Sequence, residues 1–384
     1  MIYFDNSATT LQKPKSVAEE VFRGIASEQF ANPGRGAHIS AHNALEELFK
    51  TRAALAALFN VKNPLKIALC QNASAALNLV IKSLFSANDH IITTKLEHNS
   101  MLRPLYQLEA QGAEISHIGF NTKSGELFYN QIEEKIKKNT KAIAVNHCSN
   151  VIGSICKLDY IHSLCKKYNL IMLVDASQSA GTIPIDVSNY ENSIFCFTGH
   201  KGLYGPQGTG GIVVNGKFEF RPVFAGGSGI HSFDHNHPSE MPDVFETGTM
   251  NVPSFMGLTA GCNYVLKTGV EQINSKLNIL RNAFIESVKT IPCIKMYGAD
   301  CAKKSEEFGA AIGINIGTIP SGEISRILDE EYGIATRPGA HCAPLVHETF
   351  GTEEQGIVRF SFSSFNTLEE IKTAALALRK IAES

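Results

Sequence analysis

Ile171-Met-Leu-Val-Asp175 is an unbroken apolar run that ends in a carboxylate, and Ile194-Phe-Cys-Phe197 is a second such run that leads into Thr-Gly-His-Lys201. Strands that are covered on both faces read as continuous apolar runs rather than as alternating ones. Each run is therefore predicted to be a buried strand that places polar or charged side chains at its carboxyl end.

Other short apolar runs lie on both sides of these two along the chain. They are Ile67–Cys70, Ile91–Thr94, Ala142–His147 and Gly211–Val214. Amphipathic segments at Tyr129–Lys138 and Leu158–Tyr168 separate some of them. Strands that alternate with helices predict an α/β fold with a mainly parallel sheet flanked by helices. In such sheets ligands bind at the carboxyl ends of the strands.

The sequence after residue 224 has a different pattern. Phe224–Asn251 is rich in Gly, His, Pro and Ser and has weak periodicity, which predicts an extended functional loop. The segments expected beyond it are a helix near Val270–Thr290, an apolar run at Ala310–Ile316, a helix at Gly322–Tyr332, a strand at Ile357–Phe362 and a final helix from Leu368. This order predicts a smaller α+β domain.

The composition excludes several classes of protein. With 43% apolar residues in 384, the chain buries a large core and is not intrinsically disordered. Its 35 basic and 37 acidic residues give a net charge of −2, so nothing indicates nucleic-acid or membrane-surface binding. No apolar stretch approaches the roughly 18 residues that span a bilayer.

The cysteines and the first residues indicate where the protein works. The 9 cysteines have no paired or zinc-site spacing, which predicts reduced thiols, and all but one are expected to be inert and packed. Met1–Asn6 has neither the basic nor the apolar region of a secretory signal. We therefore expect a cytoplasmic protein.

Lys201 and Asp175 are the first candidates for chemistry. A lone lysine is usually an exposed loop residue. A lysine at the end of a buried strand, however, can lose solvent and become a nucleophilic amine. Asp175 can cap a helix, yet a carboxylate buried at a strand end needs a cationic partner, and a protonated pyridine nitrogen is one such partner.

Cys342 is the cysteine that stands apart. It lies in Arg337-Pro-Gly-Ala-His-Cys342, a loop bounded by Gly and Pro. The adjacent His341 and the nearby Arg337 favour an exposed, activated thiolate. The alternative is an inert, packed cysteine, which describes most cysteines.

Asp-x-x-Gln178 followed by Thr-Gly-His-Lys201 resembles the pyridoxal 5′-phosphate (PLP) signature of class V aminotransferases. The chain is most similar to the cysteine desulfurase family in its group II, selenocysteine-lyase-like form, from Tyr3–Thr10 to Val358–Phe362 and Phe365–Thr367. The resemblance implies the PLP-dependent transferase fold type I, with a mainly parallel, seven-stranded sheet flanked by helices. We expect residues 16–258 to form the large PLP-binding domain and residues 1–15 with 259–384 the small α+β domain.

The resemblance also implies a set of site residues. The catalytic residues would be Lys201, as the Schiff-base lysine, Cys342, as the persulfide-forming nucleophile, and His98, which would stack on the cofactor ring and relay protons. The further cofactor-binding residues would be Ala73, Ser74, Asn150, Asp175, Gln178, Thr198, His200 and Thr249, the last donated by a neighbouring subunit. The substrate-binding residues would be Arg359, Arg337, Asn150 and His38.

Two of these roles have plain alternatives. His98 alone would be read as a helix-capping histidine. An arginine in a C-terminal strand, such as Arg359, pairs with a structural carboxylate more often than with a ligand, although its surroundings favour a grip on the substrate carboxylate. Arg337 either binds substrate or tunes the Cys342 loop.

The implied activity is the removal of sulfur from L-cysteine, which yields L-alanine and a persulfide on Cys342. The implied partners are a second copy of the chain, with shared active sites, and a sulfur- or selenium-acceptor protein. L-selenocysteine as substrate, an aminotransferase that never uses Cys342, and a scaffold that only docks partners all remain open.

The sequence departs from the family pattern at three places. The predicted phosphate loop, Asn72-Ala-Ser74, has a single hydroxyl, Gly202 reads as an insertion after the lysine, and Pro338 stiffens the Cys342 loop. The histidines 231, 235 and 237 with Asp234 invite a metal site. A loop without strands or helices holds metal ligands poorly, so we expect no metal there and instead a role in screening the partner's active site.

Overall fold

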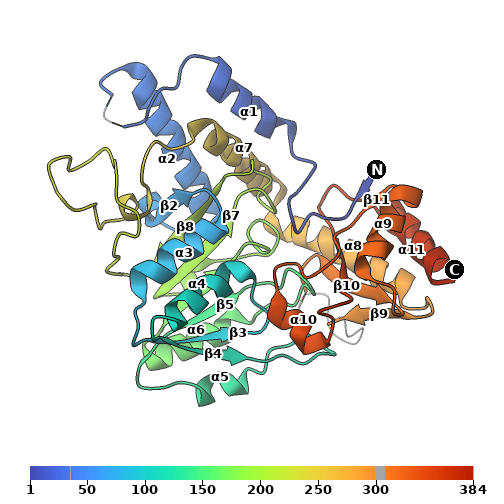
Figure 1. Cartoon of the computed structure of the whole chain (residues 1–384). Helices are drawn as coiled ribbons and strands as arrows, with labels where there is room; N and C mark the ends of the chain where they lie inside the picture. The colour runs from blue at the N-terminus through green and yellow to red at the C-terminus, as the bar shows by residue number, and fades with distance from the viewer. Residues whose placement is uncertain (35, 299–307, 384) are drawn as a thin grey trace.

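The computed structural model describes residues 1–34, 36–298 and 308–383 (Figure 1). Its centre is a seven-stranded sheet in the order β2-β8-β7-β6-β5-β3-β4. The strands are β2 (Ile67–Cys70), β3 (His90–Thr94), β4 (Glu114–Ile118), β5 (Thr140–Asn146), β6 (Ile171–Asp175), β7 (Ser193–Thr198) and β8 (Gly210–Asn215). Only β8 runs antiparallel to its neighbours in this sheet. The predicted fold class is therefore confirmed.

The six apolar runs are strands, and β2 and β6 have the predicted bounds. The prediction missed β4, whose side chains are mostly half-buried or exposed because it forms the edge of the sheet. It also made α5 too long, since this helix covers only Asn130–Glu134.

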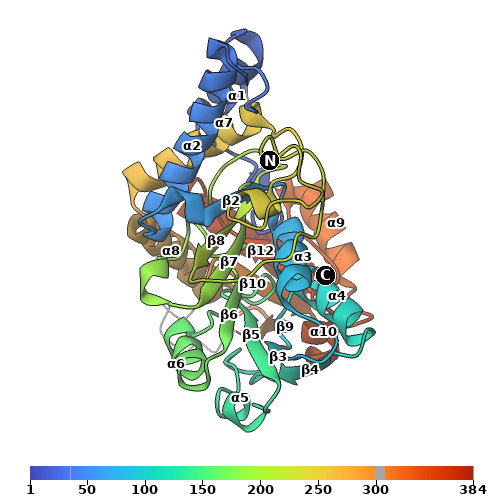
Figure 2. The ribbon, with the colours of Figure 1, turned by 90° about the vertical axis from the view of Figure 1, so that its left-hand side faces the viewer.

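Helices cover both faces of the sheet. The remaining helices of this part are α1 (Lys15–Ala26), α2 (Ile39–Phe59), α3 (Ala73–Leu84), α4 (Asn99–Glu109), α6 (Leu158–Tyr168) and α7 (Val252–Thr268), with 3-10 turns at Pro64–Lys66, Val187–Asn189 and Asp243–Phe245. Figure 2 shows α3 and α4 on one side of the sheet and α6 on the other. Helices α1, α2 and α7 pack together beyond β2.

The C-terminal part of the chain forms a smaller sheet with its own helices. Its antiparallel sheet has the order β12-β10-β9, and β1 pairs with β11 in parallel. The elements are β1 (Ile2–Tyr3), α8 (Val270–Val288), β9 (Ile294–Tyr297), β10 (Ala311–Ile316), α9 (Ser321–Tyr332), β11 (Ile334–Ala335), α10 (Pro344–Phe350), β12 (Val358–Ser361) and α11 (Leu368–Glu383). The predicted elements of this part are present, with ends that differ by up to two residues.

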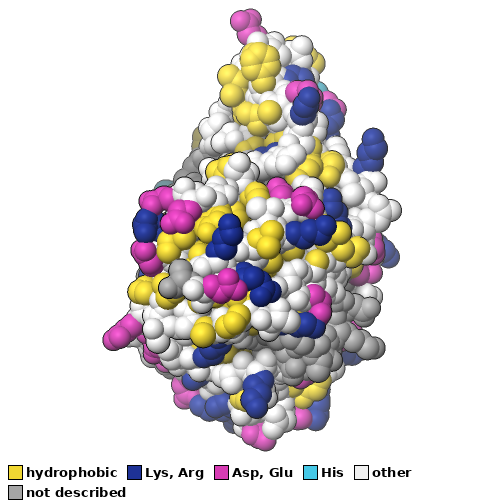
Figure 3. Space-filling view, turned by 90° about the vertical axis from the view of Figure 1, so that its right-hand side faces the viewer, with side chains coloured by type: hydrophobic (Ala, Val, Ile, Leu, Met, Phe, Trp, Pro, Cys, Tyr) yellow, Lys and Arg dark blue, Asp and Glu magenta, His cyan; other side chains and the backbone are white. Residues whose placement is uncertain are grey.

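The hydrophobic cores support the predicted division of the chain. One buried cluster collects Phe4 with apolar residues from Val265 to Ile381, together with Tyr204. Two other clusters fill the faces of the large sheet. The boundaries at residues 16 and 258 stay a prediction. On the face that carries α9 and α11, charges of both signs are interspersed with apolar side chains (Figure 3).

The segment from Phe224 to Asn251 has no helix or strand except the turn at Asp243–Phe245, as predicted. Within the described residues no group of three or more His, Cys, Asp and Glu side chains is arranged to hold a metal ion. His231 and Asp234 approach to 3.8 Å as an exposed pair. None of the described helices is both long and apolar enough to cross a bilayer, and the predicted cytoplasmic location stays untested.

Candidate active site

A cavity of about 350 Å³ lies at the carboxyl ends of β5, β6 and β7, where a parallel sheet normally binds its ligands. Most of the predicted site residues line this cavity: Ala73, Ser74, His98, Asn150, Asp175, Gln178, Thr198, His200, Lys201, Arg337, Cys342 and Arg359. Segments from the whole length of the chain therefore meet at one place. His38 and Thr249 are not among the residues that line it.

Asp175 and Lys201 come from neighbouring strands, β6 and β7. The Asp175 Oδ1 atom accepts hydrogen bonds from the Ser177 backbone N at 2.9 Å and from its Oγ at 2.5 Å. Burial lowers the pKa of Lys201 to about 8, although the negative charge of Asp175 opposes the shift. At pH 7 about one tenth of Lys201 is therefore the neutral, nucleophilic amine, and this fraction rises as the pH approaches 8.

The turn that carries Lys201 is held by the N-terminal segment. The His200 carbonyl accepts hydrogen bonds from the Thr10 backbone N at 3.1 Å and from Thr9 Oγ1 at 3.2 Å, and the Lys201 carbonyl accepts from Thr10 Oγ1 at 2.8 Å. The unusual Gly202 suits this turn, because a Cβ there would lie 2.5 Å from the Ala180 backbone oxygen. No sequence pattern predicted these contacts between the N-terminal segment and the Lys201 turn.

The first turn of α3 forms another wall of the cavity. Asn72 caps the helix, since its side chain accepts a hydrogen bond from Ala75 N at 2.9 Å, and Ala73 and Ser74 follow at the mouth of the cavity. The backbone N–H groups and the positive end of such a 12-residue helix attract anions. Across the cavity, the buried Nδ1 of His200 has no hydrogen-bond partner within the described residues.

His98 combines the two roles that the sequence left open. It caps α4, because its Nδ1 atom accepts a hydrogen bond from Ser100 N at 3.0 Å, and it also lines the cavity. With Nδ1 as acceptor, the ring proton sits on Nε2. Burial lowers the pKa of His98 to about 4, so the ring is neutral at pH 7.

The loop around Cys342 has a special backbone. His341 and Cys342 both have a positive φ, +52° and +55°, which costs roughly 1–2 kcal/mol for each residue that is not glycine. Asn150 Nδ2 donates to the His341 carbonyl at 2.9 Å, and Asn99 N donates to the Cys342 carbonyl at 2.7 Å. Contacts from the large sheet therefore hold the exposed thiol at the cavity.

His341 does not activate Cys342 as the sequence predicted. Its ring is buried, its Nε2 atom lies 2.9 Å from the Ile357 carbonyl, and burial holds its pKa well below the ordinary value. A neutral histidine supplies no positive charge beside the thiol. Its contribution is to the shape of the loop.

The other cysteines follow the expectation in part. Six are buried: Cys70, Cys148, Cys156, Cys165, Cys196 and Cys262. Burial raises the pKa of Cys148 to about 12, which keeps it a thiol although it touches the cavity wall. Cys293 is exposed, which corrects the prediction that it is packed. Cys301 lies outside the described residues.

The two arginines of the cavity, Arg359 and Arg337, both pair with Asp5. Arg359 Nη2 lies 2.8 Å from Asp5 Oδ1, and Arg337 Nη2 lies 2.9 Å from Asp5 Oδ2. Arg359 thus has the structural carboxylate partner that was weighed as the alternative to substrate. Both guanidinium groups still line the cavity, and their substrate role stays a prediction.

Two predicted residues lie away from this cavity. His38 is exposed and caps α2, where its Nδ1 accepts from Ala41 N at 3.3 Å. Thr249 is exposed and lines a separate groove of about 700 Å³. Within one chain neither residue reaches the site.

Sequence reasoning also missed Glu97, which is completely buried next to His98. Its Oε1 atom accepts from Thr94 Oγ1 at 2.6 Å and from Asn146 N at 3.0 Å, and burial raises its pKa to about 8. A protonated Glu97 therefore fastens the ends of β3 and β5 beneath the site. The signal was a carboxylate three positions beyond the end of an apolar strand, Thr94 being the last residue of β3.

These side chains fit PLP. A neutral amine at Lys201 suits an aldehyde, the carboxylate of Asp175 suits a protonated pyridine nitrogen, and the α3 N-terminus with the unpartnered His200 Nδ1 suits a phosphate. The fold and the site together define an α/β enzyme of the aminotransferase kind.

Comparison with known proteins gives the family. The model of the "Aminotransferase class-V" family matches residues 2–373. A probable cysteine desulfurase of Pyrococcus abyssi is 32% identical, over 100% of this chain and 95% of that protein. Another from Synechocystis is 31% identical, over 97% and 88%.

Solved structures agree. The apo structure of a cysteine desulfurase from Thermococcus onnurineus superposes with a TM-score of 0.91 at 31% identity, covering 100% of this chain and 94% of that one. The cysteine desulfurase CsdA of Escherichia coli, at 24% identity and a TM-score of 0.86, shares the fold over 99% of this chain and 94% of its own. The chain belongs to the aminotransferase class-V family, whose enzymes use PLP, and within it to the relatives of the cysteine desulfurases.

Proposed function

We propose that this protein is a cysteine desulfurase that converts L-cysteine to L-alanine and keeps the sulfur as a persulfide on Cys342. The observation that carries the proposal is that Cys342, an exposed thiol on a backbone held in an unusual conformation, lines the same cavity as Lys201, an amine whose pKa burial lowers to about 8. The relatives named above as cysteine desulfurases support it.

The proposed cofactor, PLP, would be held by Lys201, Asp175, the first turn of α3, His200 and Thr198, with His98 and Gln178 beside the ring. When bound, this group supplies an electron sink that stabilises negative charge at the α-carbon of an amino acid. Gln178 is already oriented by the hydrogen bond from its Nε2 atom to the Ser7 carbonyl at 3.0 Å.

The chain's own residues supply the remaining chemistry. Lys201, with a pKa of about 8, can take a proton at Nζ and return it near neutral pH. The Cys342 thiolate attacks the substrate sulfur, so an S–S bond forms and the substrate C–S bond breaks. The atoms balance, because L-cysteine and the Cys342 thiol give L-alanine and a Cys342 persulfide.

The test is a paired turnover assay with L-cysteine and L-selenocysteine on the wild type, Cys342→Ala and the exposed-thiol control Cys293→Ser. We expect Cys342→Ala to lose sulfide release, to keep part of its selenide release and to retain the cofactor absorbance, and we expect Cys293→Ser to match the wild type. Unchanged sulfide release in Cys342→Ala would favour an aminotransferase. A wild type that acquires no absorbance with PLP would favour a scaffold.

We further infer that the active protein is a homodimer whose subunits complete each other's sites. The exposed apolar side chains of Leu45, Phe49 and Leu65 line the same groove as Thr249, which supports contact with a second copy there. Phe49→Asp should then lower the mass measured by light scattering from two chains to one, whereas Leu376→Asp, at an exposed position of α11, should not.

The exposure of Cys342 also suits delivery of the sulfur to an acceptor protein. Such an acceptor must present its own thiol to the persulfide, because the sulfur moves by attack of a thiolate on an S–S bond. The incubation of persulfide-loaded enzyme with a small thiol should release one equivalent of sulfide.

A further inference from the structure

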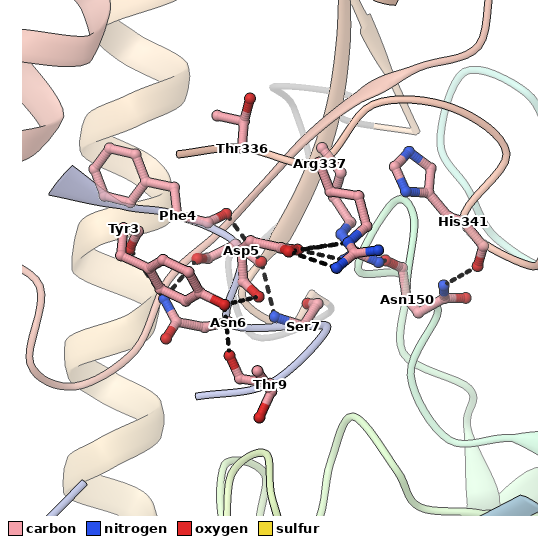
Figure 4. Close-up of polar contacts among 12 residues, drawn as sticks. Tyr3, Phe4, Asp5, Asn6, Ser7, Thr9, Asn150, Thr336, Arg337 and His341 are labelled. Carbon is pink, nitrogen blue, oxygen red and sulfur yellow. Dashed lines mark hydrogen bonds and ion pairs between the residues drawn. The ribbon is translucent and has the colours of Figure 1, made fainter. Parts of the chain in front are cut away.

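Asp5 is shared by the two arginines of the cavity. Its Oδ1 atom lies 2.8 Å from Arg359 Nη2 and 3.2 Å from Arg337 Nε, and its Oδ2 atom lies 2.9 Å from both Nε and Nη2 of Arg337. Figure 4 shows the carboxylate of Asp5 directed at the Arg337 guanidinium. A carboxylate that takes four charge-assisted contacts fixes both planar groups.

The backbone explains why a carboxylate is needed there. Arg337 and Arg359 face each other on antiparallel segments, with N–H to O distances of 3.3 and 2.8 Å between their backbones. Directly opposed like charges destabilise a pair of strands. Asp5 lies on the same edge of β12 as Arg337, in a parallel bridge with Ser361, and its charge relieves this repulsion.

Both arginines keep donors or exposed surface beyond their contacts with Asp5. Arg359 is 2% exposed, its Nη1 donates to the Asn150 carbonyl at 3.1 Å, and its Nε has no hydrogen-bond partner within the described residues. Arg337 is half-exposed and lines the cavity. Burial lowers the pKa of Arg359 and Asp5 opposes that shift. Two cations and one anion leave one net positive charge facing the cavity.

We propose that Asp5 is a positioning residue that sets the strength of the substrate-carboxylate site, by holding Arg337 and Arg359 in place and cancelling one of their two charges. This inference rests on the proposed function, since it assigns the arginines to the α-carboxylate of an amino acid. A site with one net charge binds that carboxylate and still releases the carboxylate of the product. Without Asp5, the site binds the carboxylates of both the substrate and the product too tightly.

The test uses Asp5→Asn, Arg337→Gln and the double variant, all as holoenzymes. Asparagine keeps the shape and one acceptor oxygen of Asp5 but removes its charge. The net charge of the site becomes two in Asp5→Asn, zero in Arg337→Gln and one again in the double variant. Tyr3→Phe is the control, because among the described residues the hydrogen bonds of Tyr3 Oη go to two backbone carbonyls, those of Asp5 and Thr9, and to no side chain.

The readout is the dissociation constant of L-alanine and of L-alaninamide, which lacks the carboxylate, from the change in cofactor absorbance. We expect Asp5→Asn to bind L-alanine roughly tenfold more tightly, as one extra charge at an effective dielectric constant of about 20 allows, with L-alaninamide unchanged. Arg337→Gln should bind L-alanine more weakly, and the double variant and Tyr3→Phe should resemble the wild type.

A merely structural role for Asp5 predicts another result, in which L-alanine and L-alaninamide weaken together in Asp5→Asn. That result, or unchanged constants for both ligands, overturns the proposal. If Asp5→Asn does not fold, the Arg337→Gln and double variants decide, because the double variant must then recover L-alanine binding relative to Arg337→Gln. A wild type that binds L-alanine normally but releases no sulfide would refute the desulfurase function alone.

Discussion

We expect the buried charge of Lys201 to lower the free energy of unfolding of the apo protein. Burial lowers its pKa from the ordinary value of 10.5 to about 8, because folding removes water from around the charged amine. Each pH unit of such a shift corresponds to about 1.36 kcal/mol, which gives about 3 kcal/mol as an upper bound. Lys201→Met removes the buried charge, although Asp175 then loses an attractive partner. We expect the apo variant to be about 1–3 kcal/mol more stable than the wild type at pH 7.

The stability difference between the wild type and Lys201→Met should depend on pH. Between about pH 8 and pH 10.5 the unfolded chain binds more protons at this lysine than the folded chain does, so the wild type gains stability as the pH rises through that window. The advantage of Lys201→Met is therefore complete below pH 8 and disappears by about pH 10.5.

Urea unfolding of the apo wild type and of apo Lys201→Met at pH 7 and at pH 10.5 measures the stability difference and its change with pH. The control is Lys123→Met, at an exposed turn position, which should change stability little and equally at both values. An apo Lys201→Met protein that is less stable than the wild type at pH 7, or a difference that does not shrink with pH, would refute the reasoning.

Three other perturbations test how the site is held. Glu246→Ala leaves the buried Arg52 without its carboxylate at 2.5 Å and should cost about 3–5 kcal/mol in urea unfolding. Gly202→Ala places a Cβ 2.5 Å from a backbone oxygen and should cost about 1–3 kcal/mol and weaken PLP binding, measured by titration. Asn150→Leu leaves the His341 carbonyl without its donor, so single-turnover persulfide formation should slow roughly five- to 100-fold, the equivalent of about 1–3 kcal/mol.

The buried strands, with Asp175 and Lys201 at or beyond the ends of two of them, were predictable because a short stretch of sequence marks each one. A run of four apolar residues followed by Asp175 identifies both a buried strand and a carboxylate at its end, and β6 has the predicted bounds. Lys201 follows β7 in the same way. Where an edge strand is mostly half-buried and contains polar residues, as β4 does, the local signal is weak and the prediction failed.

The N-terminal segment could be matched to a family but not given a role from its sequence. Asp5 meets Arg337 and Arg359 across 332 and 354 residues of chain, and no spacing within a motif reports such a pairing. The same holds for Thr9 and Thr10, which clamp the Lys201 turn. Only the folded chain shows that residues 5–10 contact the backbone of Lys201, the two arginines and Gln178 at once.

The Cys342 loop shows why the site needs both parts of the fold. Its left-handed residues are unfavourable in isolation, and the donors that hold them come from the part of the chain that carries the large sheet: Asn99 N from the start of α4 and Asn150 Nδ2 from the loop after β5. Arg359 on β12 likewise reaches the carbonyl of Asn150. The thiol therefore reaches the cavity that Lys201 lines only when the small sheet is docked against the large one. A loss of docking should abolish persulfide formation while Asp175 and Lys201, the proposed cofactor-binding pair, stay in place on the large sheet.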